Sequence, residues 1–177
     1  PLAPDFDLIV HGQGEAFQAG LDVLAKLTSG KVHLNVDHKN TTSKVFLNSK
    51  NVQINHFSGP HPAGNVSVHA SRISPINKGE IIWYVGPQEV MTIGKLFLDG
   101  VFNSERIIAL AGSEVSKPRY YKTFIGASIT NMVSGNVSDN NNRYISGNVL
   151  TGMKTEKSGF VHFYDSLITV IPEGDYA

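Results

Sequence analysis

The sequence has 177 residues, of which 41% are hydrophobic and 17% charged, and 15 basic residues balance 15 acidic ones. Such a chain can bury the core of one domain or two small ones, and its even charge argues against a polyanionic partner. It has no cysteine, which excludes disulfides and thiolate chemistry, and no apolar run of eighteen residues that would span a membrane.

The densest basic segment is Lys117-Pro-Arg119-Tyr-Tyr-Lys122. Basic residues interleaved with aromatic ones can stack single-stranded bases, but a few charges on one predicted strand are typical of a solvated face. We therefore expect no nucleic-acid partner.

The first hundred residues alternate between strand patterns and helix patterns. Apolar residues recur every three or four positions from Gly14 to Ser29, which predicts an amphipathic helix that ends at Gly30. The other elements expected here are strands over Asp7–Val10, Lys31–Val36, Val52–Phe57 and Ile81–Val85, and helices over Thr42–Leu47, Asn65–Ile73 (N-cap Asn65) and Pro87–Gly100. We expect the strand over Ile81–Val85 to be buried, and the apolar stripe of the last helix to comprise Val90, Ile93, Phe97 and Leu98. This order implies parallel strands and predicts an incomplete doubly wound α/β layer over residues 1–103.

The pattern changes in residues 104–177. The elements expected there are strands over Arg106–Gly112, Tyr120–Ile125 and Tyr144–Leu150, a short helix over Ser128–Val133 with Ser128 as its cap, and one or two strands within Phe160–Ile171. A hairpin followed by a packing helix and a further strand predicts a β-grasp (ubiquitin-like) module.

A glycine-rich turn near the N-terminus suggests nucleotide binding. A predicted strand leads through Gly12-Gln-Gly14 into a helix, and Asp37 follows the next strand. In a dinucleotide fingerprint the glycine amides hold a pyrophosphate and the acid binds a ribose hydroxyl. Phe17 stands where the third glycine is needed, so a plain strand-to-helix turn is the stronger interpretation.

The histidines do not form a metal-binding motif. The seven are His11, His33, His38, His56, His61, His69 and His162. No two of them have His-x-His or His-x-x-x-His spacing and the carboxylates are scattered, so we expect no metal site. The chain also lacks a Gly-x-Ser-x-Gly elbow, which argues against a hydrolase.

The segment Ser58-Gly59-Pro60-His61-Pro62-Ala63-Gly64 is the strongest candidate for a contact site. It lies between a predicted strand and a predicted helix, where open α/β sheets present their ligands. The His61 imidazole can exchange hydrogen bonds with a polar head group or a partner backbone. The alternative is that the prolines and glycines only steer the chain across the sheet edge.

Distinctive blocks of sequence lie along almost the whole chain. These blocks are the 58–64 segment, Ile73-Ser-Pro-Ile-Asn-Lys78, Trp83, Gln88-Glu-Val90, Ile93-Gly-Lys-Leu-Phe97, Glu105-Arg-Ile-Ile-Ala-Leu-Ala-Gly112, Pro118-Arg119, Ile125-Gly-Ala-Ser128, Arg143-Tyr-Ile-Ser-Gly147 and Val149-Leu-Thr-Gly152. Together they resemble NqrA, one of the subunits of the Na⁺-translocating NADH:quinone oxidoreductase. Their common order and spacing make the resemblance far more specific than any single motif.

The resemblance implies a Rossmann-like domain followed by a soluble-ligand-binding β-grasp (SLBB) module, with a boundary near residue 103. It implies a peripheral subunit on the cytoplasmic face of the bacterial inner membrane, whose complex passes electrons from NADH to ubiquinone or menaquinone and expels sodium. The resemblance further implies a subunit that carries no covalent flavin and no iron–sulfur cluster and that is associated with quinone binding. It also implies that this chain is a middle segment of the subunit, which by itself should bind no cofactor and not oxidise NADH.

Three hypotheses follow. In the leading one, the chain supports quinone association and docking to the other subunits, with contacts from Gly59, His61, Pro62, Gly64, His69 and Arg72. The second is an oxidoreductase domain that binds NAD or flavin through Gly12, Gly14 and Asp37. The third is a scaffold that serves assembly alone.

Overall fold

The computed structural model describes residues 3–138 and 141–174 and divides the chain into two compact units. One unit spans Phe6–Asn103, and the other combines the first five residues with Ser104–Ala177. Each unit has its own sheet.

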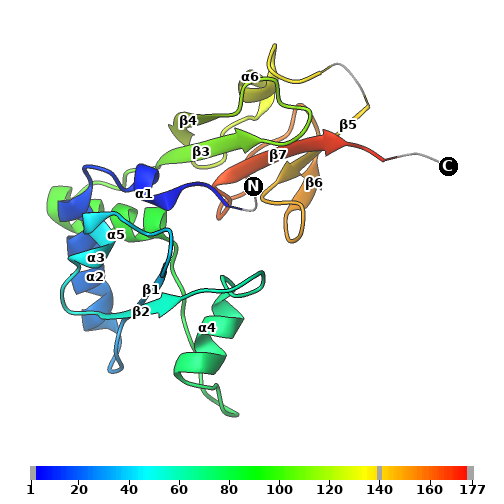
Figure 1. Cartoon of the computed structure of the whole chain (residues 1–177). Helices are drawn as coiled ribbons and strands as arrows, with labels where there is room; N and C mark the ends of the chain where they lie inside the picture. The colour runs from blue at the N-terminus through cyan, green and yellow to red at the C-terminus, as the bar shows by residue number, and fades with distance from the viewer. Residues whose placement is uncertain (1–2, 139–140, 175–177) are drawn as a thin grey trace. The chain divides into compact units, whose positions relative to one another are not determined.

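The unit of residues 6–103 contains five helices and two strands among its described residues (Figure 1). In chain order they are α1 (Phe6–Ile9), α2 (Gly14–Leu27), β1 (His33–Asp37), α3 (Lys44–Leu47), β2 (Gln53–Phe57), α4 (Val66–Ile73) and α5 (Pro87–Asp99). The two strands pair in parallel, from His33 opposite Gln53 to Asp37 opposite Phe57. The predicted parallel pairing of these strands is therefore confirmed.

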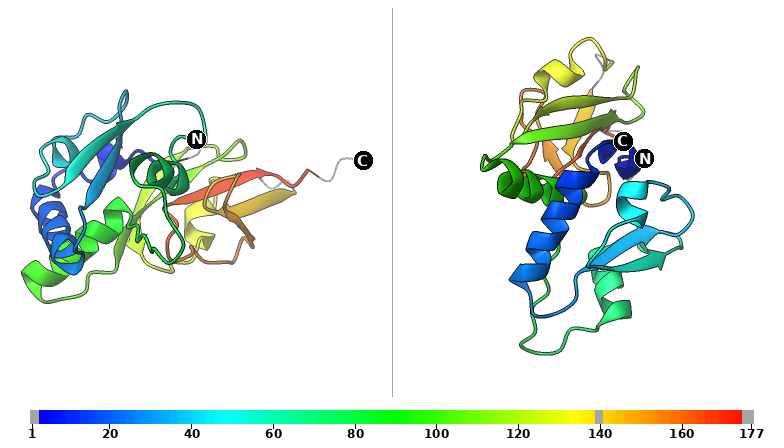
Figure 2. Two further views of the ribbon diagram at one scale, coloured as in Figure 1. Left: turned by 90° about the horizontal axis from the view of Figure 1, so that it is seen from below. Right: turned by 90° about the vertical axis from the view of Figure 1, so that its left-hand side faces the viewer.

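Helices α2 and α5 pack side by side and form most of this unit's core (Figures 1 and 2). Phe17 and Leu21 of α2 are buried, as are Val90 and Met91 of α5. The Phe17 ring meets the edge of Phe46 from α3, with ring centroids 5.2 Å apart. Phe17, which breaks the glycine fingerprint, is thus a core residue.

The strand predicted over residues 7–10 is wrong, because Phe6–Ile9 forms the short helix α1. The three apolar residues Leu8–Val10 are too few to distinguish a strand from a buried helical turn by their period. Here Ile9 and Val10 are buried, and the Asp7 carboxylate accepts hydrogen bonds from the Thr42 and Ser43 amides at 2.6 and 2.9 Å. Tertiary contacts hold this segment as a helical turn.

The buried strand predicted over residues 81–85 is also wrong. Ile81–Val85 is neither helix nor strand, and its side chains are exposed. Its composition suits a strand, but no described strand pairs with it. The apolar stripe predicted for α5 is only partly right, since Phe97 and Leu98 are exposed near the helix end.

The second unit is built on a five-stranded mixed sheet (Figure 2). Its elements are β3 (Glu105–Ala111), β4 (Arg119–Phe124), α6 (Thr130–Val133), β5 (Asn142–Ser146), β6 (Met153–Thr155) and β7 (Leu167–Pro172). The strand order is β4-β3-β7-β5-β6, in which only β3 and β7 are parallel neighbours.

One face of this sheet carries the larger core of the second unit. Ile108, Leu110, Ile168 and Val170 pack there against residues of and around α6. The Tyr121 hydroxyl donates a hydrogen bond of 2.8 Å to the Met132 carbonyl, which ties the hairpin to the helix. The alternating apolar residues of β3 and β7 thus lie on the same face of the sheet, where they pack against the residues of and around α6.

Three sequence predictions for this unit need correction. The strand expected to reach Leu150 ends at Ser146, and the short strand β6 was missed. The extended segment expected from Phe160 is a strand only from Leu167. The loop before Leu167 is held by side-chain hydrogen bonds. The Ser146 hydroxyl donates to the Asp165 carboxylate at 2.6 Å and accepts from the His162 amide at 3.0 Å. The cap of α6 is Ile129, and the Ser128 hydroxyl accepts a weaker 3.3 Å bond from Thr130 N–H.

Candidate functional site

The carboxyl ends of β1 and β2 meet at one edge of their sheet. Because the strands are parallel and in register, the residues after Asp37 and after Phe57 leave the sheet side by side. This edge is where open parallel sheets place their ligands. The candidate site consists of the turn 37–41, the loop 58–65 and helix α4.

The loop 58–65 is a compact surface turn. The Ala63 amide donates to the Pro60 carbonyl at 2.9 Å, and the Asn65 amide donates to the Pro62 carbonyl at 2.8 Å. The predicted contact residues Gly59, His61, Pro62 and Gly64 are all exposed. The loop therefore presents the His61 imidazole to solvent on a backbone that is hydrogen-bonded within itself.

His69 holds this loop in place from helix α4. Its Nε2 lies 2.9 Å from the Ala63 carbonyl oxygen, which only accepts, so Nε2 carries the proton. Its ring lies over Phe57, the last residue of β2, with centroids 4.2 Å apart. Of the predicted contacts on α4, His69 thus positions the loop.

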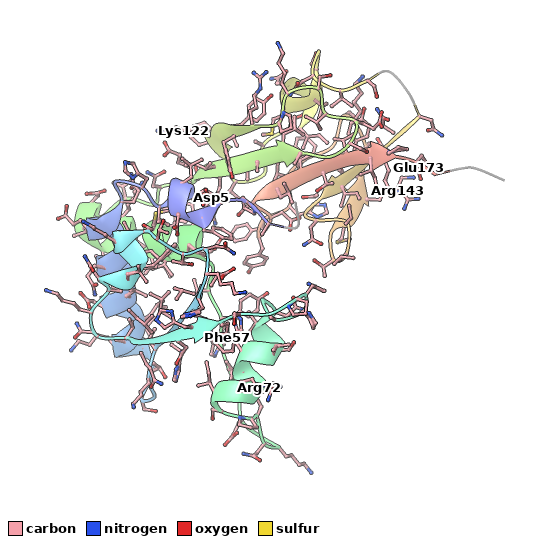
Figure 3. All side chains as sticks on the ribbon, viewed as in Figure 1. Asp5, Phe57, Arg72, Lys122, Arg143 and Glu173 are labelled. Atoms are coloured by element: carbon pink, nitrogen blue, oxygen red, sulfur yellow. The ribbon has the colours of Figure 1, made fainter. Side chains whose placement is uncertain are left out.

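Arg72 lies on α4 and carries an exposed guanidinium group (Figure 3). Asn65 is the N-cap residue of this helix, as predicted, but its side chain makes no capping bond. Helix α4 has no fully buried residue. The segment 58–72 therefore contains no buried residue and is mostly exposed, and His69 links it to the sheet by its contact with Phe57.

The alternative nucleotide residues lie in a different setting. Gly12 lies in a turn between helices α1 and α2, and Gly14 is the first residue of α2. The dinucleotide fingerprint needs a strand before its glycines. Since residues 6–9 are helical, the structure offers no support for that hypothesis.

Asp37 is engaged by its own turn. Its Oδ1 accepts from the Lys39 amide at 2.8 Å and the Asn40 amide at 3.2 Å, and its Oδ2 accepts from the Asn40 side chain at 2.8 Å. These hydrogen bonds lower the pKa of the Asp37 carboxyl. The bond from the Lys39 amide has the largest effect, and the bond from the Asn40 side chain has the next largest. The Asp37 carboxylate thus stabilises the turn that follows β1.

We expect the turn at residues 37–41 to loosen in acid. A lowered folded-state pKa means that the turn gains stability from Asp37 above the ordinary value of 3.8, and loses it as pH falls through the lowered pKa. Titration of the Asp37 carboxyl carbon by NMR should give a pKa below 3.8, with the Lys39 and Asn40 amide shifts following it. A measured value at or above 3.8 would contradict the hydrogen-bonded turn.

Sequence reasoning missed how two further histidines lie at this edge. The rings of His38 and His56 are 5.6 Å apart and nearly perpendicular, and both residues are exposed. The two residues are far apart in the sequence, so their proximity could not be seen there. It follows from the register in which β1 and β2 pair. Over residues 3–138 and 141–174, no group of three His, Asp or Glu side chains could hold a metal ion.

Comparison with known proteins places both units in one family. Residues 1–102 match the NqrA second alpha/beta domain, and residues 107–157 match the NQRA C-terminal domain. The chain belongs to the NqrA family. The family resemblance inferred from the sequence blocks is confirmed.

Three named relatives show the extent of the match to the NqrA family. Each is the NqrA component of a Na(+)-translocating NADH-quinone reductase, from Photorhabdus laumondii (40% identical), Yersinia pseudotuberculosis (40%) and Neisseria meningitidis serogroup B (39%). Each alignment covers 98% of this chain and 39% of the relative. The chain thus spans about two fifths of the length of these proteins.

Of the helices in the described part of the chain, none is long and apolar enough to cross a membrane.

Proposed function

We propose that this chain is part of a peripheral subunit of a Na⁺-translocating NADH:quinone oxidoreductase, on the cytoplasmic face of the bacterial membrane. It supports quinone association and docking to the other subunits, while NADH oxidation and the redox centres belong to other parts of the complex. The family membership carries this proposal. The exposed surface 58–72 at the carboxyl edge of β1 and β2 supports the location of the contact.

We also propose finer descriptions of the two units. For the second unit, the strand order β4-β3-β7-β5-β6, in which the neighbours β3 and β7 are parallel, supports a β-grasp module of the SLBB type. For the first unit, parallel strands joined through helices support a partial Rossmann-like layer. We place the boundary between two domains, 1–103 and 104–177, after residue 103; the division at Asn103 and Ser104 supports this proposal, although the first five residues group with the second unit.

His61 is the residue in this surface best placed to touch a quinone head group. Quinone oxygens accept hydrogen bonds, and an exposed imidazole N–H is a suitable donor. The bond from His69 to the Ala63 carbonyl keeps the loop in a defined conformation before any ligand arrives. Such preorganisation favours binding because less ordering is needed when the ligand binds.

We expect a soluble short-chain ubiquinone to shift the amide NMR signals of residues 58–72. His61→Ala should weaken this binding about tenfold, the usual effect of removing one hydrogen bond to a ligand. The matched control is His11→Ala, since His11 is also exposed but lies in the turn after α1. Shifts confined to other surfaces, or equal weakening by both variants, would contradict the assignment of this loop.

A further inference from the structure

Strand β4 is the longer of the two edges of the five-stranded sheet. The order β4-β3-β7-β5-β6 places β4 and β6 at the outside, and β4 has six residues where β6 has three. β4 contains no proline, and its pairing with β3 runs without a bulge from Arg119 opposite Leu110 to Phe124 opposite Glu105. Short strands, prolines and bulges are the usual means of blocking an edge, so β4 is the edge on which a further strand can pair.

The outer edge of β4 carries open backbone groups. The Ile125 amide donates to the Ser104 carbonyl at 2.9 Å, and alternate residues of an antiparallel strand bond to the same neighbour. The amides and carbonyls of Tyr120 and Lys122 therefore point away from β3. Among the described residues, no hydrogen bond engages these four groups. The edge thus offers both donors and acceptors to an extended chain.

Two aromatic side chains lie beside this edge on the face of the sheet away from α6. In the antiparallel register Tyr120 lies opposite Ala109, which is buried with Ala111 and Leu167 on that face. Phe124 lies on the same face and is 64% exposed. A strand added next to β4 would place a side chain against the Phe124 ring and enlarge this small apolar cluster.

The edge is basic. Lys117, Arg119 and Lys122 are exposed, and no acidic residue lies within residues 117–124. Lys122 pairs with Glu105 of β3 at 2.8 Å, so its charge is balanced within the sheet (Figure 3). Over residues 3–138 and 141–174, Lys117 and Arg119 form no ion pair. Charge complementarity therefore favours an acidic partner at the Arg119 end of the strand.

We propose that β4 binds an extended acidic segment of a partner protein, which pairs with its outer edge as a further strand. In this mode of recognition, backbone hydrogen bonds provide affinity and alternate side chains provide specificity. Apolar side chains of the segment lie beside Tyr120 and Phe124, and its acidic side chains lie on the other face with Arg119. The contact is with protein in the second unit and not with quinone, so it goes beyond the proposed function and either can fail alone.

A model peptide tests this pairing on the full chain. The probe alternates valine and glutamate, is about eight residues long and is capped at both ends, which is enough to span β4. Its binding should slow hydrogen exchange of the Tyr120 and Lys122 amides at least about tenfold, whereas the Tyr121 amide, which already bonds to β3, should change little. A matched peptide with lysine in place of glutamate should bind at least about tenfold more weakly, and Arg119→Glu should weaken the glutamate probe similarly.

Lys122→Pro and Lys122→Ala separate backbone pairing from charge. Both variants remove the Lys122 charge, but only proline removes the outward amide, which β3 does not use. Lys122→Pro should therefore bind the glutamate probe at least about tenfold more weakly than Lys122→Ala. Circular dichroism in the far ultraviolet checks that both variants fold. A probe N-methylated at alternate residues, which lacks the donors of one edge, tests the same point on the unmodified chain.

Several outcomes would overturn the proposal. They are no binding of the probe at about 1 mM, equal binding of the glutamate and lysine peptides, unprotected Tyr120 and Lys122 amides, and a probe whose affinity N-methylation does not change. Tighter binding of single-stranded oligothymidylate would assign the edge to nucleic acid instead. Dimerisation of the chain in sedimentation velocity, with the same two amides protected, would assign it to a second copy.

Discussion

Gly94→Ala should lower the free energy of unfolding of the α2–α5 unit by about 2–3 kcal/mol, the upper part of the usual range for overpacking a tight core. A Cβ on Gly94 of α5 would fall on the Ala16 carbonyl oxygen and lie 2.9 Å from the Gly20 backbone nitrogen. These are backbone atoms of α2, which cannot rotate away as a side chain can. The two helices would have to move apart around buried residues such as Phe17 and Val90.

The direction of this effect separates packing from helix propensity. In an exposed helix, Gly→Ala stabilises by roughly 1 kcal/mol, so a net loss must come from the helix contact. Chemical denaturation followed by circular dichroism in the far ultraviolet measures the change. The matched control is Gly64→Ala, where nothing lies within 4 Å and the effect should stay within about 1 kcal/mol. A neutral or stabilising Gly94→Ala would show that the helices are not in close contact.

Gly112→Ala should destabilise the second unit by about 3 kcal/mol or more, because a steric clash and an unfavourable backbone conformation act together. Gly112 follows β3 with a φ of +129°, which L residues rarely adopt. An added Cβ would also fall on the Val170 carbonyl oxygen and lie 2.7 Å from the Val170 nitrogen in β7. The clash occurs beside the β3–β7 pairing, at the centre of the sheet order.

Gly135→Ala is the control for the free-energy cost of placing an alanine at a positive φ. Gly135 has a φ of +66° but nothing lies within 4 Å of its added Cβ, so the variant should lose only about 1 kcal/mol. Thermal and chemical unfolding of the two variants gives the comparison. If Gly112→Ala cost no more than Gly135→Ala, the close approach of residue 112 to Val170 would be wrong.

Much of the secondary structure could be predicted because local patterns determine it. The helical period of residues 14–27 and the Pro87 and Gly100 boundaries of α5 were sufficient for those helices. The alternation around Arg119–Phe124 and the turn before it predicted the β3–β4 hairpin, which the antiparallel register confirms. The failures included short apolar runs, at residues 7–10 and 81–85, whose state depends on partners elsewhere in the chain.

The candidate site could be predicted as a segment but not as an arrangement. Glycines and prolines marked the loop 58–64, and the strand before it suggested a sheet edge. Nothing local indicated that His69 would bind the Ala63 carbonyl while His61 faces solvent. The His38–His56 pair likewise depends on the register between β1 and β2.

The sequence by itself determined the periodic helices, the parallel strands β1 and β2, the β3–β4 hairpin, and the family, because these depend on local spacing and on blocks of residues in a fixed order. Only the tertiary structure decided that residues 6–9 are helical, that Ile81–Val85 is exposed, and that Asp37 is held by its own turn. The physical reason is that burial and hydrogen bonding are properties of neighbours in space. A short segment takes the conformation in which those neighbours bury its apolar side chains and pair its polar groups.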